Sequence, residues 1–386
     1  MWSDGAIRDE IWGYCIIRFR SGVIMEERLG DGWLYDGPAA SRLWEKSAIG
    51  VIVDEGKLLL TDSEVIFCFA HRGIELPQPL QINVSGGWIA ERAQKNPVLL
   101  QEAAILEALR VPGNKLVLSK NVESLGFEAS ASWGLRWNSD THPSNDPPVS
   151  EVLWYHSKDE LFDTENDPSS VLRHLLHWCS SVTNKGRIAE VLVIDDEQSV
   201  VTYRIKESNP RGHLIEPTTQ TFKLISEMPS LNQGLGGSFI PDVSDWPREA
   251  IGIPAHEGRY LDAIESYLVE YMSSDPMKED KIGKLSESAS ILLDLWMRGL
   301  NTRSGFKYGT TWRCYPGNVG DGHAPWLVID PNKEGPANWA DACLSSRLAS
   351  GVNKQWLLPI LDDGNWRYLE ISRPPSDSRW SNPTRR

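Results

Sequence analysis

The stretch that decides the fold is Gln355-Trp-Leu-Leu-Pro-Ile-Leu-Asp-Asp-Gly-Asn-Trp-Arg-Tyr-Leu-Glu-Ile371. Two apolar runs within it flank turn-forming residues, which predicts two strands joined by a tight turn. The same plan occurs earlier, where the apolar run 189–194, an acidic turn and the run 200–205 follow one another. Helical sequence precedes both pairs, at 171–179 in the earlier case. We interpret the two regions as copies of one unit.

The chain divides around these two copies. Its 386 residues exceed the usual size of a single domain, so two or three compact units are expected. Residues 206–255 contain several prolines and the run Asn232-Gln-Gly-Leu-Gly-Gly237, a composition typical of a linker with limited regular structure. The predicted divisions are an N-terminal extension with short strands (1–46), a first repeat (47–207), a linker (208–255), a second repeat (256–374) and a basic tail (375–386).

Local signals place individual elements. Thr61-Asp-Ser-Glu64 has the spacing of a capping box and predicts the start of a helix. Another helix is expected at 98–108, where proline and glycine follow and end it. The helix predicted at 286–298 presents an apolar face that we interpret as core. The stretch 305–315 is predicted as one strand, from which Tyr315 emerges among basic neighbours.

Composition and charge narrow the class of protein. The chain is 40% hydrophobic and 24% charged, as in globular proteins, and no window approaches the roughly 18 apolar residues of a membrane helix. The first ten residues lack the pattern of a secretory signal, so we expect a cytoplasmic protein. Five scattered cysteines fit neither a disulfide framework nor a zinc site, and we predict reduced, mostly buried thiols.

The net charge of −14 argues against a uniformly basic nucleic-acid-binding surface. Any such site must therefore be local. The densest basic regions are 298–313 and the C-terminal tail, and a solvated surface is the simpler interpretation of the tail.

Three side chains in the second copy suggest a chemistry. Proton transfer to and from a ribose 2′-hydroxyl and a departing 5′-oxygen needs two groups that exchange protons, and a phosphate that gains charge needs a fixed cation. Tyr315, His323 and Lys354 suit these three tasks. Taken singly, each has a simpler explanation as a packed tyrosine, an ordinary histidine or a solvated lysine. Their combination predicts cleavage of RNA without metal.

Four motifs surround these residues: Leu295-Trp-Met-Arg-Gly-Leu300, Ser304-Gly-Phe-Lys-Tyr-Gly-Thr-Thr-Trp-Arg-Cys-Tyr315, Gly322-His-Ala-Pro-Trp-Leu-Val328 and Ser346-Arg-Leu-Ala-Ser-Gly-Val-Asn-Lys-Gln-Trp-Leu-Leu358. In them the chain resembles the archaeal tRNA-splicing endonucleases, also called tRNA-intron lyases, over roughly residues 285–373. The resemblance implies an α+β fold of two tandem repeats, each with a small N-terminal α/β subdomain and a C-terminal nuclease-like α/β subdomain. It further implies the fused two-repeat type of the family, which forms a homodimer.

The resemblance implies an endonuclease that cleaves precursor tRNA at intron boundaries in a bulge-helix-bulge element, with no metal and no cofactor. Tyr315 would be the general base toward the 2′-hydroxyl, His323 the acid toward the 5′-oxygen, and Lys354 would stabilise the pentacovalent phosphate. The implied products are a 2′,3′-cyclic phosphate and a 5′-hydroxyl. A tyrosine with an ordinary pKa of about 10 is a poor base at neutral pH, so this role needs nearby positive charge, for which Arg313 and Lys354 are candidates.

Members of the family also hold a flipped-out bulge nucleotide between two arginines, which stack on the base. Arg347, seven residues before Lys354, matches the first of them. The second is expected near the final strand, where we choose Arg367, with Arg373 as the alternative because the turn lengths leave the register open. An exposed strand residue is the other interpretation of Arg367.

The first repeat departs from this pattern where the chemistry would lie. Aligning its run 126–137 with the strand of the second repeat puts Arg136 or Trp137 in the place of Tyr315, and the histidine that follows is His142, in a proline-rich loop. We therefore expect this repeat to be noncatalytic. His174 and His177 lie one helical turn apart, but no third ligand cluster accompanies them, so no metal is assigned.

The acidic turn Asp195-Asp196-Glu197 has two interpretations. It is either an ordinary hairpin tip or, from the resemblance, a loop that docks into a basic pocket of the catalytic unit on a partner chain. Two other classes of function compete with the endonuclease. A noncatalytic RNA-binding or assembly subunit would have lost one of the three residues, and none is lost. A metal-dependent nuclease would need clustered carboxylates, and Asp362-Asp363 are too few.

Overall fold

The computed structural model describes residues 14–18, 24–28, 32–54, 56–128, 131–162, 170–242, 244–274 and 284–383. They form two compact units, each of which combines helices with a sheet, as expected of a mixed α+β fold. Unit 1 consists of Met1–Ser157, Asn184–Thr202 and Pro375–Arg386, and unit 2 of Lys158–Thr183 and Tyr203–Pro374. None of the described helices is long and apolar enough to cross a bilayer.

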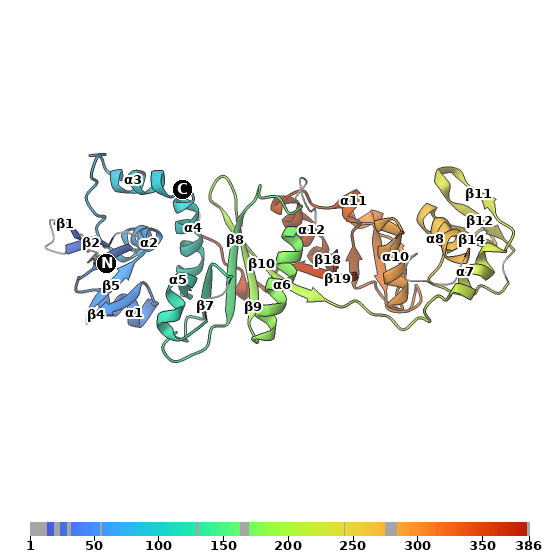
Figure 1. Ribbon diagram of the computed structural model, residues 1–386, viewed down its shortest axis with the longest axis horizontal. Coiled ribbons are helices and arrows are strands. Elements are labelled where there is room, and N and C mark those ends of the chain that lie inside the picture. The colour runs from blue at the N-terminus through green and yellow to red at the C-terminus, as the bar shows by residue number, and fades with distance from the viewer. Residues whose placement is uncertain are drawn as a thin grey trace, which may run out of the picture. The chain divides into compact units, whose positions relative to one another are not determined.

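The N-terminal part of unit 1 is an antiparallel sheet in the order β1-β2-β3-β5-β4, with three helices (Figure 1). Its elements are β1 (Tyr14–Arg18), β2 (Ile24–Arg28), β3 (Gly32–Tyr35), α1 (Ala40–Ser47), β4 (Val51–Asp54), β5 (Lys57–Leu60), α2 (Asp62–Arg72) and α3 (Gly87–Lys95). Thr61 and Glu64 form the predicted capping box at the start of α2. The predicted division at residue 46 does not hold, because β3 pairs with β5 and buries Trp33 and Tyr35 in the same core as Leu58.

A second sheet in unit 1 has the order β9-β8-β7-β6. Its strands and the elements near them are α4 (Leu99–Arg110), β6 (Lys115–Leu118), α5 (Ser119–Val122), η1 (Glu123–Leu125), β7 (Gly134–Trp137), β8 (Ser150–His156), β9 (Ile188–Ile194) and the start of β10 (Val200–Ser208). Helix α4 confirms the helix expected at 98–108.

The described part of the C-terminal tail, which includes the short turn η4 (Ser376–Ser378), packs on unit 1. Thr202 Oγ1 donates to the carbonyl of Trp380 at 2.8 Å, and the backbone N–H of Val200 donates to Asn382 Oδ1 at 3.1 Å. The guanidinium of Arg136 lies 5.0 Å from the centroid of the Trp380 ring. The tail is thus anchored by side chains rather than solvated throughout; the last two arginines, Arg385 and Arg386, lie outside the described residues.

The N-terminal part of unit 2 is also regular. Its elements are α7 (Thr219–Ser226), β11 (Leu231–Asn232), η2 (Gly234–Gly236), β12 (Ser238–Pro241), β13 (Ile253–Ala255), β14 (Gly258–Leu261) and α8 (Ala263–Ser273), with the strand order β11-β12-β14-β13. The prediction of a linker over 208–255 is therefore wrong. Glycine in this segment allows short strands to approach closely. A Cβ on Gly258 would lie 2.3 Å from the carbonyl oxygen of Ile240.

The N-terminal parts of the two units share a local motif in which a buried glutamate ties a glycine to a helix start. Glu64 Oε1 accepts from Gly50 N–H at 3.0 Å, and Glu265 Oε1 accepts from Gly252 N–H at 3.1 Å. In each case the other carboxylate oxygen accepts from the N–H of the residue that caps the helix. Both glycines have a left-handed φ, +73° and +66°, which a residue with a Cβ rarely adopts.

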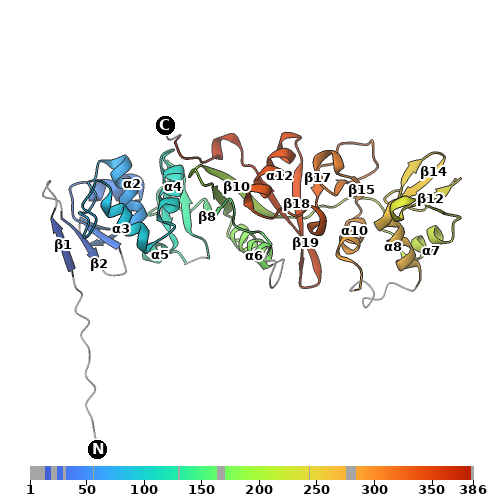
Figure 2. The same ribbon diagram turned by 90° about the horizontal axis from the view of Figure 1, so that it is seen from above.

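The rest of unit 2 carries the residues that the sequence singled out. Its elements are α6 (Ser170–Asn184), α10 (Glu287–Met297), β15 (Asn301–Ser304), η3 (Phe306–Tyr308), β16 (Trp312–Tyr315), β17 (Trp326–Val328), α11 (Pro331–Glu334), α12 (Trp339–Gly351), β18 (Gln355–Asp362) and β19 (Asn365–Ser372). The strand order is β15-β16-β17-β18-β19-β10, and α12 packs against β18 and β19 (Figures 1 and 2). Helix α10 and the β18–β19 hairpin are as predicted.

The strand predicted over 305–315 is correct only at its end. Two short antiparallel strands, β15 and β16, are joined by a loop that contains the 3₁₀ turn η3. Gly309, with φ +65°, ends this turn, so the chain cannot run extended through it.

Candidate active site

The strand register puts Tyr315, His323 and Lys354 at one edge of the sheet in unit 2. Tyr315 is the last residue of β16, which runs antiparallel to β17 with Cys314 opposite Trp326. Strands β17 and β18 are parallel, with Trp326 beside Gln355. The end of β16 and the beginnings of β17 and β18 therefore share an edge. His323 stands three residues before β17 and Lys354 directly before β18, so the register brings all three to that edge.

Lys354 is held by two contacts. Its Nζ donates to the carbonyl oxygen of Ala324, the neighbour of His323. The same Nζ lies 5.4 Å from the centroid of the Tyr308 ring, within the range of a cation–π interaction. The segment that carries His323 is thus tied to Lys354 through one hydrogen bond.

Tyr315 lies among positive charges. Its side chain is buried, and the guanidinium of Arg313 is 5.9 Å from its ring centroid. Burial lowers the pKa of Arg303, and Tyr315 is among the groups that oppose this shift, so Arg303 is also within electrostatic reach of the phenol. Sequence reasoning named Arg313 but missed Arg303, because the strand that carries it was not predicted.

The loop with His323 is supported by a segment that sequence reasoning had assigned to the linker. His323 itself is exposed. The backbone N–H of His213 donates to the carbonyl of Pro316 at 2.8 Å, and its imidazole lies over Gly317, where an added Cβ would be 2.6 Å from Nε2. The sequence offers one signal for this role, which is that His213 follows a proline and a glycine. No nearby residue connects His213 with Tyr315, so the sequence alone could not place it here.

The two arginines considered as partners of Arg347 in binding the bulge base lie at opposite ends of strand β18, with Arg373 at one end and Arg367 at the other. Arg347 is exposed on α12. Burial raises the pKa of Tyr203, and Arg347 and Arg373 both oppose this shift, so both guanidinium groups are within electrostatic reach of that phenol. Extending the β18–β19 register from Leu357 and Glu370 puts Arg373 opposite Lys354.

Arg367, our first choice as partner of Arg347, does not fit this geometry. It lies opposite Ile360, toward the hairpin turn at the far end of β18 from Lys354. Its guanidinium is engaged with Glu207 at 2.9 and 2.6 Å and with Asp362 at 2.6 Å. Those bonds lie in the plane of the guanidinium and hold it at this end of the strand pair, away from Lys354.

The strands of unit 1 have the same register as those of unit 2. The pairings Arg136–Ser150 and Ser150–Ile188 correspond to Cys314–Trp326 and Trp326–Gln355. By this correspondence the counterparts of Tyr315, His323 and Lys354 are Trp137, Pro147 and Arg187. On this correspondence Trp137, rather than Arg136, stands at the position of Tyr315.

The counterparts of Tyr315 and His323 cannot exchange protons as the two reactive groups would. Trp137 is buried and donates through Nε1 to the carbonyl of Asp146 at 2.8 Å. Proline has no proton to transfer, and Arg187 is paired with Glu151 at 2.7 Å. Arg136 is buried in a two-pronged ion pair with Glu190, at 2.7 and 3.0 Å. His142 Nε2 donates to the carbonyl of Trp44 at 3.0 Å, and the His142 ring lies edge-on to the Trp44 ring.

In the acidic turn, the three residues differ in what they do. Asp195 Oδ1 accepts from the N–H groups of Glu197 and Ser199 at 3.0 and 2.7 Å, so this carboxylate shapes the turn. The carboxylate of Asp196 lies 3.4 Å from Nε2 of His156 and is mostly exposed. Glu197 is exposed. Two of the three charges are therefore presented outward.

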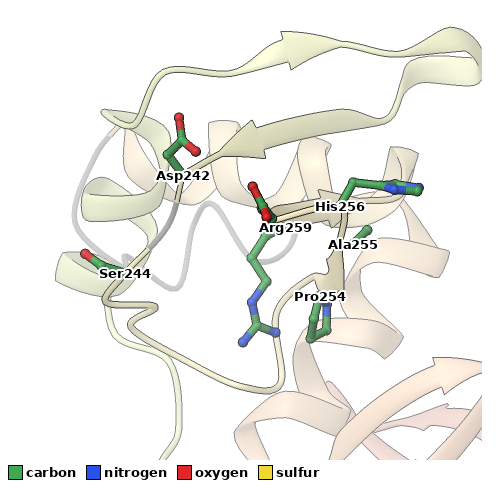
Figure 3. A pocket seen from close by; sticks show the side chains of 8 residues that line it. Asp242, Ser244, Pro254, Ala255, His256 and Arg259 are labelled. Carbon is green, nitrogen blue, oxygen red and sulfur yellow. The ribbon is translucent and has the colours of Figure 1, made fainter.

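Other candidate sites stand apart from this edge. His177 is bonded to Asp362 at 2.9 Å rather than to His174, and within the described ranges no three His, Cys, Asp or Glu residues are grouped to hold a metal ion. A pocket of about 630 Å³ lies by β13 and β14, where Arg259 extends between the segments of Ser244 and Pro254 (Figure 3). It contains none of the three candidate catalytic residues.

The region that contains the three candidate residues is similar in sequence to known proteins. A family model described as the catalytic C-terminal domain of tRNA intron endonuclease matches residues 287–368. The chain is 30% identical over 181 residues to the tRNA-splicing endonuclease of Thermoplasma volcanium, covering 47% of this chain and 53% of the relative. It is 24% identical over 234 residues to that of Methanococcoides burtonii, covering 52% and 63%.

The tRNA-splicing endonuclease of Methanothermobacter thermautotrophicus is 33% identical over 118 residues, which are 27% of this chain and 69% of that relative. The chain thus spans little more than half the length of the Thermoplasma relative and less than two-thirds of the Methanococcoides one. These matches and the catalytic-domain match show that the chain belongs to the tRNA-splicing endonuclease family.

Proposed function

We propose that the protein is an endonuclease that cleaves precursor tRNA at the boundaries of an intron, within a bulge-helix-bulge element. The observation that carries this proposal is that the strand register puts Tyr315, His323 and Lys354 at the same edge of one sheet. Each residue type suits one task of the reaction, and all three belong to the unit whose sequence matches the catalytic domain of the family.

The proposed reaction is a transesterification. The Tyr315 phenolate takes the proton of the ribose 2′-hydroxyl, and the 2′-oxygen attacks the adjacent phosphorus. The bond from phosphorus to the 5′-oxygen breaks, and His323 gives a proton to that oxygen. The products are a 2′,3′-cyclic phosphate and a 5′-hydroxyl, and no water is consumed. Lys354 stabilises the charge that accumulates on the phosphate oxygens.

Two cations lie near Tyr315: Arg313 beside its ring and the half-buried Arg303 within electrostatic reach. Positive charge at this sheet edge also explains how a chain with a net charge of −14 could bind RNA. The protein needs to contact the RNA only at the bulges and the nearby phosphates.

We further propose two tandem repeats, of which unit 2 carries the catalytic one. The matching registers of the strands and the shared glutamate motif support a common origin of the two regions. With Trp137, Pro147 and Arg187 at the corresponding places, each chain has one set of reactive groups. A bulge-helix-bulge element has two bulges, so a homodimer would present one site to each.

Recognition of the bulge base is assigned to Arg347 and Arg373. The strand register, which puts Arg373 opposite Lys354 and Arg367 opposite Ile360, supports this pair over one that includes Arg367, and both chosen arginines are within electrostatic reach of Tyr203. The exposed carboxylates of Asp196 and Glu197 are proposed to dock on a basic surface of the partner chain, as the resemblance implies.

The experiment is cleavage of a bulge-helix-bulge RNA in EDTA, under single-turnover conditions with enzyme in excess. His323→Ala and Lys354→Ala are expected to slow cleavage by at least about 100-fold. Matched controls are His177→Ala and Lys333→Ala, whose side chains are paired with Asp362 and Asp330 outside the proposed site. Mapping of the product ends should give a cyclic phosphate. Cleavage that stops in EDTA, or that survives in both variants, would contradict the mechanism.

The competing function is a noncatalytic RNA-binding or assembly subunit. It predicts that the pure protein binds the RNA but leaves it intact, with or without divalent cations. The same assay therefore separates the two proposals.

A further inference from the structure

The ring of Tyr308 is in contact with Lys354. The ammonium of Lys354 lies 5.4 Å from the ring centroid and also donates to the carbonyl of Ala324. A cation at this distance is attracted to the electron-rich face of an aromatic ring. The ammonium is thus held between that face and the segment that leads from His323 into β17.

The turn that presents Tyr308 is closed by its own bonds. Gly305 N–H donates to Thr311 at 2.9 Å, and Tyr308 N–H donates to Gly305 at 2.7 Å. Thr310 is buried beneath the turn, and a Cβ on Gly305 would lie only 2.3 Å from its hydroxyl oxygen. These bonds fix the backbone of the turn, and with it the position from which the Tyr308 ring contacts Lys354.

The neighbouring aromatic residue shows that this contact is specific to Tyr308. Phe306, on the same turn, is 87% exposed, whereas Tyr308 is partly buried. The turn does not bury both rings as a packing element would. It directs one ring toward the ammonium.

We propose that Tyr308 is a positioning residue for Lys354 in the cleavage reaction, an inference that rests on the proposed function. A lysine side chain is flexible and strongly hydrated, so an unsupported ammonium would have to be ordered and stripped of water as the phosphate gains charge. An ammonium has three N–H donors. One hydrogen is donated to Ala324 and one side of the ammonium faces the ring, so the proposal leaves the remaining hydrogens to donate to the scissile phosphate.

The test compares Tyr308→Leu with Tyr308→Phe in single-turnover cleavage at saturating enzyme. Phenylalanine keeps the ring face, so its rate should stay within about threefold of wild type, while leucine should lower the rate by about 10-fold with little change in Kd for RNA. Tyr267→Leu, in α8, is the control for loss of a half-exposed tyrosine in the same unit. A wild-type rate for Tyr308→Leu, or equal losses for leucine and phenylalanine, would overturn the proposal.

A second measurement does not depend on cleavage. In protein labelled with ¹³C at lysine Cε, the Lys354 signal, assigned by its loss in Lys354→Arg, should be displaced upfield by the aromatic ring. Tyr308→Leu should return it to the ordinary lysine position, and Tyr308→Phe should not. A Lys354 signal that ignores Tyr308→Leu would refute the contact itself. Absence of cleavage by wild type with the displaced signal present would instead refute the proposed function.

Discussion

Arg367 and Glu207 form a two-pronged ion pair that joins β19 to β10, with Nε to Oε1 at 2.9 Å and Nη2 to Oε2 at 2.6 Å. The guanidinium also binds Asp362, whose side chain is nearly buried. Bonds from Arg367 lower the pKa of Glu207, so both partners are charged at neutral pH. This arginine belongs to the framework of unit 2.

Arg367→Ala should therefore lower stability rather than cleavage. Because the pair is partly exposed, we expect the free energy of unfolding to fall by about 1 to 2 kcal/mol, with an unchanged single-turnover rate. Lys223→Ala, which removes an exposed ion pair with Glu227, is the control and should cost less than about 0.5 kcal/mol. If Arg367→Ala leaves the free energy of unfolding unchanged and weakens RNA binding, Arg367 contacts the bulge and this prediction is wrong.

Arg347→Ala and Arg373→Ala should weaken binding of the bulged RNA. Loss of one stacking guanidinium is expected to raise Kd by roughly 10-fold or more, because stacking on a base is worth about 1 to 3 kcal/mol. Binding of a fully paired RNA of the same length should change little. Arg379→Ala removes the same charge from the tail and serves as the control, measured by fluorescence anisotropy. Equal effects on bulged and paired RNA would reduce both arginines to general phosphate contacts.

Replacing Asp196 and Glu197 together by Ala should loosen the proposed dimer. These carboxylates are exposed, whereas Asp195 accepts two backbone hydrogen bonds in the turn and is left intact. Sedimentation velocity over a range of protein concentrations should show a larger share of monomer than in wild type at low salt, and this difference should shrink at high salt, which screens the same charges in wild type. Asp195→Ala is the comparison for damage to the turn. An unaltered dimer in the double variant would remove the docking idea.

Gly212→Ala should damage both stability and cleavage. An added Cβ would lie 2.1 Å from the carbonyl oxygen of Gly299, and backbone atoms cannot yield as a flexible side chain does. The segment would leave its place, and the hydrogen bond from His213 to Pro316 beside Tyr315 would be lost. We expect a loss of about 2 kcal/mol or more in chemical denaturation. Gly234→Ala, where a Cβ meets nothing, is the control and should be near neutral.

Burial raises the pKa of Glu265 to about 7. Its counterpart Glu64 instead has an ion pair with Arg110 at 3.1 Å. An unfolded glutamate titrates at about 4.3, so between that pH and about 7 the folded state binds more protons than the unfolded state. Stability from Glu265 is therefore fully present below about pH 4 and is lost as the pH rises to about 7, by a few kcal/mol at most.

The measurement is denaturant unfolding of wild type and Glu265→Gln from pH 4.5 to 8. Glutamine does not ionise, so the stability advantage of wild type over the variant should shrink as the pH rises. Subtraction cancels the other titrating groups. A difference that stays constant across this range would show that Glu265 keeps an ordinary pKa.

Local signals predicted helices and hairpins well, and for clear reasons. The capping box at Thr61 and the apolar face of α10 are patterns that a few neighbouring residues complete. Strand β15 was missed because Asn301-Thr-Arg-Ser304 has no apolar alternation and takes its partner from β16. Residues 208–255 were misjudged because short strands with tight turns have the glycine and proline content of a linker.

The sequence by itself determined which side chains are candidates for the chemistry, since Tyr315, His323 and Lys354 are recognisable by type and by the motifs around them. Only the tertiary structure decided that they lie at one edge of a sheet, that Arg373 rather than Arg367 stands opposite Lys354, and that Tyr308 contacts Lys354. The physical reason is that these relations depend on strand register and on contacts between residues far apart in the chain. No local run of sequence carries that information.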